Sequence, residues 1–196
     1  MKYFIFFAWL LATFGATSPL RAEPREFIID KDHFSIGFLI DHVGYAAQLG
    51  QFLEAGGRFV WDEQANELHS GEVTVEASSV FTNHRERDQH LRSDDFLHAQ
   101  RHGDIRFKAT RWVPDEANRG TLHGELTLLG QTHPVALEVT INQRAVYPFG
   151  HEKYTVGMSA RTTIRRSQWG MTYALEDGLV GDEVQLILEF EAIAGQ

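Results

Sequence analysis

Apolar and polar residues alternate with a period of two along most of the chain after residue 22. The alternation is plain at 72–77, where Val73, Val75 and Ala77 are interleaved with polar residues. Because successive side chains of a β-strand point to opposite faces of a sheet, this period predicts strands with one buried face. The pattern recurs at 27–29, 34–42, 59–61, 105–110, 122–128, 135–141, 154–166 and 184–190. We therefore expect an all-β protein.

Short polar stretches separate these runs, and we interpret Asp30-Lys31-Asp32 as the first turn. Strands joined by short turns predict an antiparallel meander, and closing the sheet removes its exposed edges. Four glycines inside the predicted strands mark sharp bends or close approaches by other groups: Gly37, Gly50, Gly124 and Gly157. They favour a strongly curved sheet, so we predict a closed antiparallel eight-stranded barrel, with residues 23–196 as its single domain. Such a barrel holds either packed side chains or one small ligand.

The segment 83–107 breaks the period of two. Its charges fall three and four residues apart, as in Arg85, Asp88 and Arg92, which places them on one side of a helix. We predict one short helix between the fifth and sixth strands that unwinds around 93–96 and leaves Phe96 to insert into an apolar site. A lone helix between two sets of strands suggests a lid or side-piece. Its charges are expected to be solvated.

The first 22 residues have the features of a targeting signal. A short basic start, Met1-Lys2, precedes an apolar run at 3–14 that is shorter than the ~18 residues of a membrane span. We predict a signal peptide at 1–22, export to the periplasm and no stable membrane insertion after cleavage after Ala22. An uncleaved anchor is the alternative, and a eukaryotic secretory signal would look similar. The chain has no cysteine, which excludes disulfides and a lipoprotein anchor.

Several classes of function are disfavoured by composition and motifs. The net charge of −9 argues against nucleic-acid binding. The sequence lacks GxSxG, a P-loop and a dinucleotide fingerprint, and Asp41-His42, as strand neighbours, would face opposite sides. His98 and His102 could share a zinc ion only on a helix continuing through both. Because we expect the helix to end earlier, we predict no metal site, no cofactor and no enzymatic activity.

Five motifs occur in order along the chain. They are Asp30-x-x-His33-x-Ser35-x-x-Phe38 with His42; His90-Leu91-Arg92-Ser93-x-Asp95-Phe96; Gly124-x-Leu126-Thr127 followed by Thr132-x-Pro134-Val135; Arg166-Ser167-x-x-Gly170-Met171; and Gly181-Asp182-Glu183-Val184. Together they resemble the bacterial YceI-like family over essentially the whole chain after residue 22. The resemblance implies a lipocalin-like barrel, periplasmic in many members, that holds an isoprenoid or another long apolar chain. The chain departs from the family's usual pattern at His98, at Gly103-Asp104 and at Gln168.

A candidate ligand site follows from strand parity and this resemblance. The predicted inward-facing apolar residues are Phe38, Phe59, Phe107, Leu126, Met158, Leu186 and Leu188. From the residues alone a solid core filled by these side chains is slightly favoured, whereas the resemblance favours a ligand. His42 and Arg166 share inward parity at strand ends, where they could meet a polar head group. Counting turns places them at opposite ends of the barrel, and an ion pair at the rim is an equal alternative for Arg166. Trp169 completes the predicted site.

The sequence therefore predicts a non-catalytic periplasmic protein that holds a long-chain amphiphile for transport, storage or sequestration. The partner would be an amphiphilic lipid such as a polyisoprenoid, a quinone or a fatty-acid-like molecule. A barrel enzyme acting on an apolar chain and a histidine-based metal-binding protein are the alternatives. The sequence does not decide between a monomer and a homodimer.

Overall fold

The computed structural model describes residues 23–116 and 118–195, so the predicted signal peptide lies outside the described residues. The strands are β1 (Arg25–His42), β2 (Ala46–Phe52), β3 (Ala55–Asp62), β4 (Glu67–Glu76), β5 (Val80–Phe81), β6 (Asp104–Glu116), β7 (Arg119–Leu128), β8 (Gln131–Val146), β9 (Tyr154–Arg165) and β10 (Val180–Ala194). One α-helix, α1 (Arg85–Arg92), and two 3₁₀ turns, η1 (Ala77–Ser79) and η2 (Arg166–Trp169), complete the described fold. None of the helices at 23–116 and 118–195 is long and apolar enough to cross a membrane.

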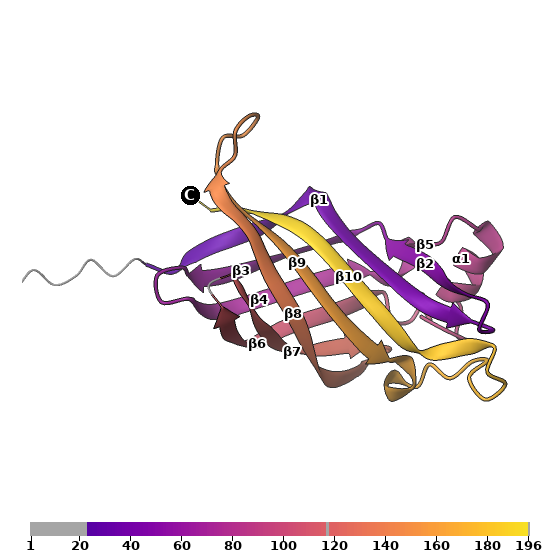
Figure 1. Ribbon diagram of the computed structural model, residues 1–196. Helices are drawn as coiled ribbons and strands as arrows, with labels where there is room; N and C mark the ends of the chain where they lie inside the picture. Colours follow the sequence, from indigo (N-terminus) through magenta and orange to yellow (C-terminus); the bar gives the residue numbers. More distant parts are fainter. Residues whose placement is uncertain (1–22, 117, 196) are drawn as a thin grey trace, which may run out of the picture.

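All strands belong to one antiparallel sheet, and pairing of β10 with β1 closes it into a barrel (Figure 1). Both β3 and β2 pair with β1, β3 along its first residues and β2 along its last, so that β2 and β3 act as one interrupted strand. In the same way β5 extends β4, since β5 pairs with β2 and β4 with β3. The wall therefore consists of eight strands, and the prediction of a closed eight-stranded antiparallel barrel with one short helix is confirmed.

The predicted turn at 30–32 is wrong. Strand β1 runs through it without reversing, and its pairing with β10 jumps from Ile29 opposite Ala192 to Phe34 opposite Phe190. The polar residues between them form a β-bulge, in which extra residues loop out while the flanking halves keep the same partner. The residues before and after the bulge therefore belong to one strand that runs in one direction.

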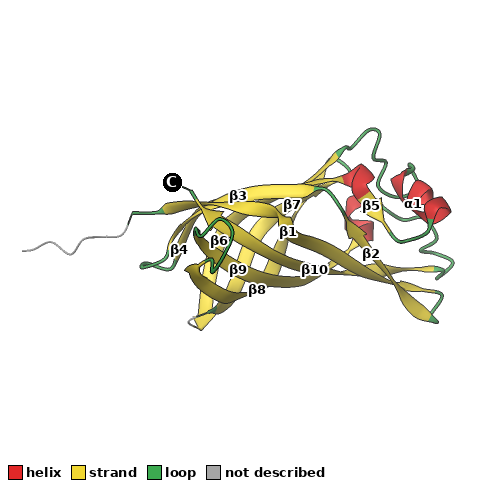
Figure 2. Cartoon of the chain, turned by 90° about the horizontal axis from the view of Figure 1, so that it is seen from above, coloured by secondary structure: helices red, strands yellow, loops and turns green. Residues whose placement is uncertain are grey.

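The helix α1 begins and ends as the sequence predicts. His84 caps its first turn by accepting a hydrogen bond from the Arg87 backbone N–H, and Ser93 ends it. Phe96, beyond the end, is buried, as predicted. Figure 2 shows α1 at the end of the barrel away from the C-terminus.

The expectation that the helix charges are solvated is wrong for three of them. Arg87 is half-buried and donates to the hydroxyl and the carbonyl of Thr82. The buried carboxylate of Asp88 accepts hydrogen bonds from the backbone N–H and the hydroxyl of Thr82. Arg92 donates to the carbonyls of Ser78 and Val80. These backbone groups lie between β4 and the residue after β5, where regular pairing with neighbouring strands is interrupted. The charged side chains of the helix therefore form the hydrogen bonds that a neighbouring strand would otherwise provide. The charges attach α1 to the barrel wall.

Two of the four strand glycines show the close approach that the sequence predicts. The ring of Phe38 covers Gly50 and the ring of Phe107 covers Gly124, each too close for a Cβ atom. At Gly37 and Gly157 the structure shows no comparable contact. Both covering rings belong to residues predicted to face inward, so the glycines make room for the side chains that line the barrel.

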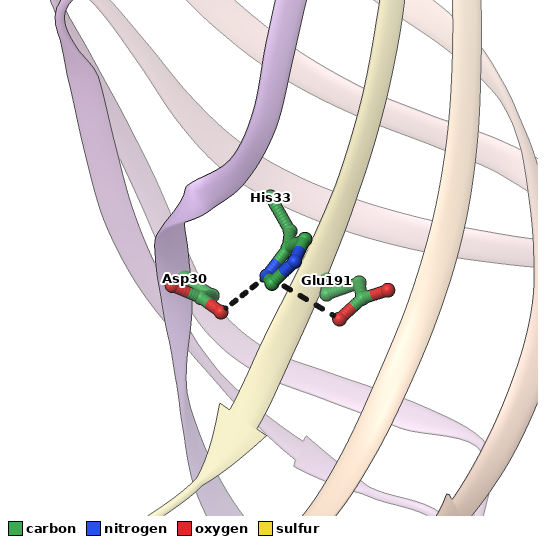
Figure 3. A group of neighbouring side chains, drawn as sticks. All are labelled: Asp30, His33 and Glu191. Carbon is green, nitrogen blue, oxygen red and sulfur yellow. Dashed lines mark hydrogen bonds and ion pairs between the residues drawn. The ribbon is translucent and has the colours of Figure 1, made fainter. Parts of the chain in front are cut away.

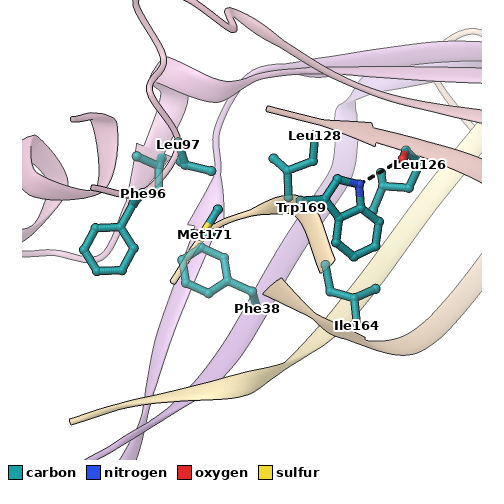
Figure 4. Close-up of a cluster of buried hydrophobic side chains, with 9 residues drawn as sticks. Phe38, Phe96, Leu97, Leu126, Leu128, Ile164, Trp169 and Met171 are labelled. Atoms are coloured by element: carbon teal, nitrogen blue, oxygen red, sulfur yellow. Dashed lines mark hydrogen bonds between the residues drawn. The ribbon is translucent and has the colours of Figure 1, made fainter. Parts of the chain in front are cut away.

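Buried apolar side chains form three clusters in the described residues, and the two larger ones lie towards opposite ends of the barrel. The cluster near α1 consists of Phe38, Val80, Phe96, Leu97, Leu126, Leu128, Ile164, Trp169 and Met171 (Figure 4). The opposite end contains Phe27, Ile29, Trp61, Ile141, Val156 and Ala192. There the rings of Phe27 and Phe59 stack with centroids 5.1 Å apart. This end is plugged by tightly packed aromatic and aliphatic side chains.

Candidate functional site: the barrel lumen

A cavity of about 480 Å³ occupies the barrel between the two ends. Most of its wall is aliphatic or aromatic, contributed by strands around the barrel and by the segment that carries α1. Its volume falls within the range of about 300–1,000 Å³ that small-molecule sites occupy. A solid core, the alternative that strand parity leaves open, is therefore not what this barrel contains.

The lumen is long as well as wide. Along β9 and into the first residue of η2 its lining runs from Met158 to Arg166. At about 3.3 Å per residue and a strand tilt of roughly 40°, this covers about 20 Å of the barrel axis. A second cavity of about 90 Å³ lies towards the plugged end. The two share several wall residues, among them Phe107 and Met158. The two cavities thus lie end to end in the barrel, with the shared side chains forming a waist between them.

Polar groups of the large cavity gather at the α1 end. Those from the β1–β2 hairpin, the α1 segment and the loop before β10 are Asp41, His42, Gln48, Thr82, Arg87, His90 and Tyr173. Arg166, at the start of η2, lies at the same end. The prediction that His42 and Arg166 mark opposite mouths is therefore wrong. It assumed that successive strands alternate in direction, whereas β2 and β3 run in the same direction, because both pair antiparallel with β1. The cavity has one polar end and one apolar end.

Arg166 is buried in the cavity wall, with only 1% of its surface exposed. Its Nε donates to the Gly181 carbonyl at 2.7 Å and its Nη1 to the Met171 carbonyl at 2.8 Å. Its Nη2 donates to the carbonyls of Tyr173 and Val180 at 3.0 and 2.9 Å. Arg166 therefore ties the loop before β10 to the barrel. All four acceptors are neutral carbonyls, so these bonds leave the positive charge of the guanidinium unneutralised.

The expected ion pair of Arg166 at the rim is absent among the described residues, and Asp182, the nearby acid, instead accepts hydrogen bonds from the N–H and hydroxyl of Ser167. Removal from water lowers the pKa of the Arg166 guanidinium, and the charge of Asp182 opposes that shift only in part. The polar end of the cavity therefore has a cation in its wall that lacks a contacting counter-ion.

The model of the YceI-like domain family matches residues 27–192. The chain belongs to the YceI-like family. It is 35% identical to Protein YceI of Salmonella agona over 189 residues, which cover 95% of this chain and 94% of that protein. It is also 35% identical to a UPF0312 protein of Pseudomonas fluorescens over 175 residues, 86% of each chain. The sequence-based assignment to this family is confirmed.

Solved structures share the barrel. The YCEI protein of Campylobacter jejuni, 26% identical, superimposes with a TM-score of 0.69 over 75% of this chain and 85% of that one. A domain from Saccharophagus degradans, described as polyisoprenoid-binding and implicated in plant cell wall breakdown, superimposes with a TM-score of 0.63 over 88% of this chain and all of that one. At 11% identity the second likeness concerns the fold alone.

The predicted ligand-site residues fall into three groups in this YceI-like barrel. Those that line the large cavity are Phe38, His42, Phe107, Leu126, Met158, Arg166, Leu186 and Leu188. Phe59 lines the smaller cavity. Trp169 lines neither; its indole Nε1 donates to the Leu126 carbonyl at 3.2 Å, and the ring packs within the wall (Figure 4). Trp169 thus supports the wall behind a lining residue.

Sequence reasoning missed the residues that cover the polar end. The rings of His90, Phe96 and Tyr173 form a cluster with centroids 4.9 to 5.2 Å apart, between the α1 segment and the loop before β10. His90 is held in turn by Asp95, whose carboxylate lies 2.8 Å from its Nε2. The sequence marked Phe96 as an inserting residue, whereas Tyr173 lies in a loop without periodicity and gave no signal. These three aromatic side chains form the lid of the lumen.

Proposed function

We propose that this protein binds a long-chain amphiphile in the barrel lumen, with its tail towards the plugged end and its head group beneath the aromatic lid. The observation that carries the proposal is the elongated apolar cavity whose polar lining is concentrated at one end. Burying apolar surface of the ligand there removes it from water, which supplies about 25 cal/mol per Å². The ligand class is a polyisoprenoid, a quinone or a fatty-acid-like lipid.

The dimensions of the cavity suit one extended chain. A fully extended alkyl chain advances about 1.3 Å per bond, given a C–C length of about 1.5 Å, so about 20 Å of lumen accommodates roughly fifteen carbons. A longer chain would have to fold back or reach into the smaller cavity through the waist near Met158. The description of the Saccharophagus degradans domain as polyisoprenoid-binding supports the same class of ligand.

The polar end offers groups that can meet a head group. His42, Arg87 and His90 line it and can donate hydrogen bonds, and Arg166 contributes an uncompensated positive charge. We propose that this end orients the amphiphile, with Arg166 acting through its charge because most of its N–H groups are already bound to carbonyls.

We propose a carrier or sequestering role without catalysis. Asp41, beside His42 at the mouth, accepts a hydrogen bond from the Gly44 backbone N–H, which occupies its carboxylate in the hairpin turn. His90 lines the cavity and contacts the carboxylate of Asp95, but Asp95 is not part of the lining, and we assign this pair to holding the lid. We further propose that the protein works in the periplasm after loss of residues 1–22, for which the sequence of that segment is the support.

Mass spectrometry of an organic extract of untagged, purified protein tests the proposal. We expect one amphiphile per chain, unchanged in mass on prolonged incubation. An extract without lipid, combined with no binding of added isoprenoid or fatty acid by the stripped protein, would contradict it. Conversion of the bound molecule by pure protein would instead establish the enzyme alternative.

A further inference from the structure

The bulge in β1 brings together three side chains on the outside of the barrel (Figure 3). Residues three apart on a regular strand point to opposite faces, but the bulge places Asp30 and His33 side by side. Glu191, on the outer face of the neighbouring strand β10, completes the group. His33 Nδ1 lies 2.8 Å from Asp30 Oδ2 and 3.8 Å from Glu191 Oε2, and the three donor atoms all lie within 4.8 Å of one another.

One of these atoms has no hydrogen-bond donor, and the nearest group that can carry positive charge is His33 at 3.8 Å. Oε2 of Glu191 is buried and accepts no hydrogen bond. A buried carboxylate oxygen without a donor is unfavourable and calls for a compensating positive charge. The orphaned oxygen faces His33 rather than solvent.

We propose that Asp30, His33 and Glu191 form a binding site for a divalent transition-metal ion of the zinc class. Zinc bonds to nitrogen and oxygen of about 2.0–2.2 Å put tetrahedral ligand atoms about 3.3–3.5 Å apart. The present spacings of 2.8 and 3.8 Å lie on either side of that value, so small side-chain movements produce the geometry. An imidazole ligand favours zinc or cobalt over magnesium and calcium, which prefer oxygen alone.

This site differs from the one that the histidine spacing suggested and revises the expectation of no metal. The rings of His98 and His102 do lie 5.7 Å apart, but no third ligand joins them among the described residues. The proposed ion would bridge β1 and β10, the two strands whose pairing closes the barrel. Its three ligands face away from the lumen, so the site does not depend on the proposed lipid.

Titration of untagged, EDTA-treated protein with Zn²⁺ by calorimetry, and with Co²⁺ by visible absorption, tests the site. We expect one ion per chain. The isosteric variants Asp30→Asn and Glu191→Gln should each raise the dissociation constant at least about ten-fold. Asp32→Asn removes a carboxylate of the same bulge that is not in the group, and should bind the ion as wild type does. The double variant His98→Ala/His102→Ala is the second control and should also bind normally.

Absence of binding by wild type, or unchanged binding by folded Asp30→Asn and Glu191→Gln, would overturn the proposal and leave the group as a hydrogen-bonded staple of the bulge. Loss of binding only in the His98→Ala/His102→Ala variant would place the ion elsewhere and overturn it too. Circular dichroism shows whether each variant is folded. If either carboxylate variant fails to fold, His33→Gln decides and should also weaken binding, because the His33 side chain is the most exposed of the three, at 50%.

Discussion

Replacing Ala160 by phenylalanine tests whether the lumen is hollow. Ala160 lies on β9, is 3% exposed and lines the large cavity. A benzyl group added at this position points into a space of about 480 Å³. The same change in a filled core would force neighbouring side chains out of their rotamers. The sign of the change in unfolding free energy therefore distinguishes the two kinds of interior.

The expected gain follows from the area that the ring buries. A phenylalanine buries about 150–250 Å², of which roughly 100 Å² exceeds what alanine buries. At about 25 cal/mol per Å² this gives an upper bound of about 2.5 kcal/mol. Loss of side-chain freedom removes about 0.5–1 kcal/mol, leaving a stabilisation of about 1–2 kcal/mol. Overpacking a filled core costs about 1–3 kcal/mol instead.

Urea denaturation of lipid-free protein measures this difference. Ala192→Phe is the matched control, since Ala192 is fully buried on β10 among the packed residues of the plugged end and lines neither cavity. We expect Ala192→Phe to destabilise the protein by about 1–3 kcal/mol while Ala160→Phe stabilises it. Equal destabilisation by both would refute a hollow lumen. Lipid undiminished in the extract of Ala160→Phe would show that the lumen is not the binding site.

Four further outcomes are expected. Met158→Arg should give soluble, β-rich protein without lipid, and unfolding of both it and Leu126→Arg would argue for a packed core. Arg166→Met leaves four carbonyls without their donor and should cost about 3–5 kcal/mol in urea denaturation; a loss below about 1 kcal/mol would contradict the tie that we describe. Burial opposes ionisation of Glu189, but hydrogen bonds from a serine and an arginine outweigh it and lower the carboxyl pKa from 4.5. Its contribution to stability is therefore complete above pH 4.5 and lost as the pH falls through the lowered pKa. Glu189→Gln should make the melting temperature fall less steeply as the pH is lowered, and an unchanged dependence on pH would exclude this contribution. Amino-terminal sequencing of the periplasmic fraction should begin at or near Glu23, and intact Met1 on most molecules would refute the signal.

The sequence by itself determined the architecture. In each strand the period of two predicts which residues face inward, because side-chain direction depends only on neighbouring positions in the sequence. The helix could be read in the same way, since its charge spacing and the end of its pattern before Phe96 depend on near neighbours only. Parity also identified eight of the ten proposed site residues as lining the large cavity. Five ordered motifs were enough to suggest the family that the comparison then confirmed.

Only the tertiary structure decided where the ends of the strands lie. The polar residues at 30–32 suit a turn and a bulge equally well, because both need backbone exposed to water. The choice depends on β10, which pairs with β1 on both sides of the interruption although it lies at the far end of the chain. That long-range pairing brings His33 beside Glu191. His42 and Arg166 reach one mouth for a different reason, which is that β2 and β3 run in the same direction along β1.

The partners of the charged side chains were equally beyond the sequence. Arg166 and Asp88 are bound by backbone groups, and a backbone carbonyl or N–H leaves no trace in the identity of the residue that carries it. Charge spacing can suggest an ion pair, but it cannot reveal that the charged side chain is already hydrogen-bonded to the backbone of another segment. Whether the inward-facing residues meet or leave a cavity is likewise set by the closure of the barrel, because strand parity fixes direction and not the distance across the lumen.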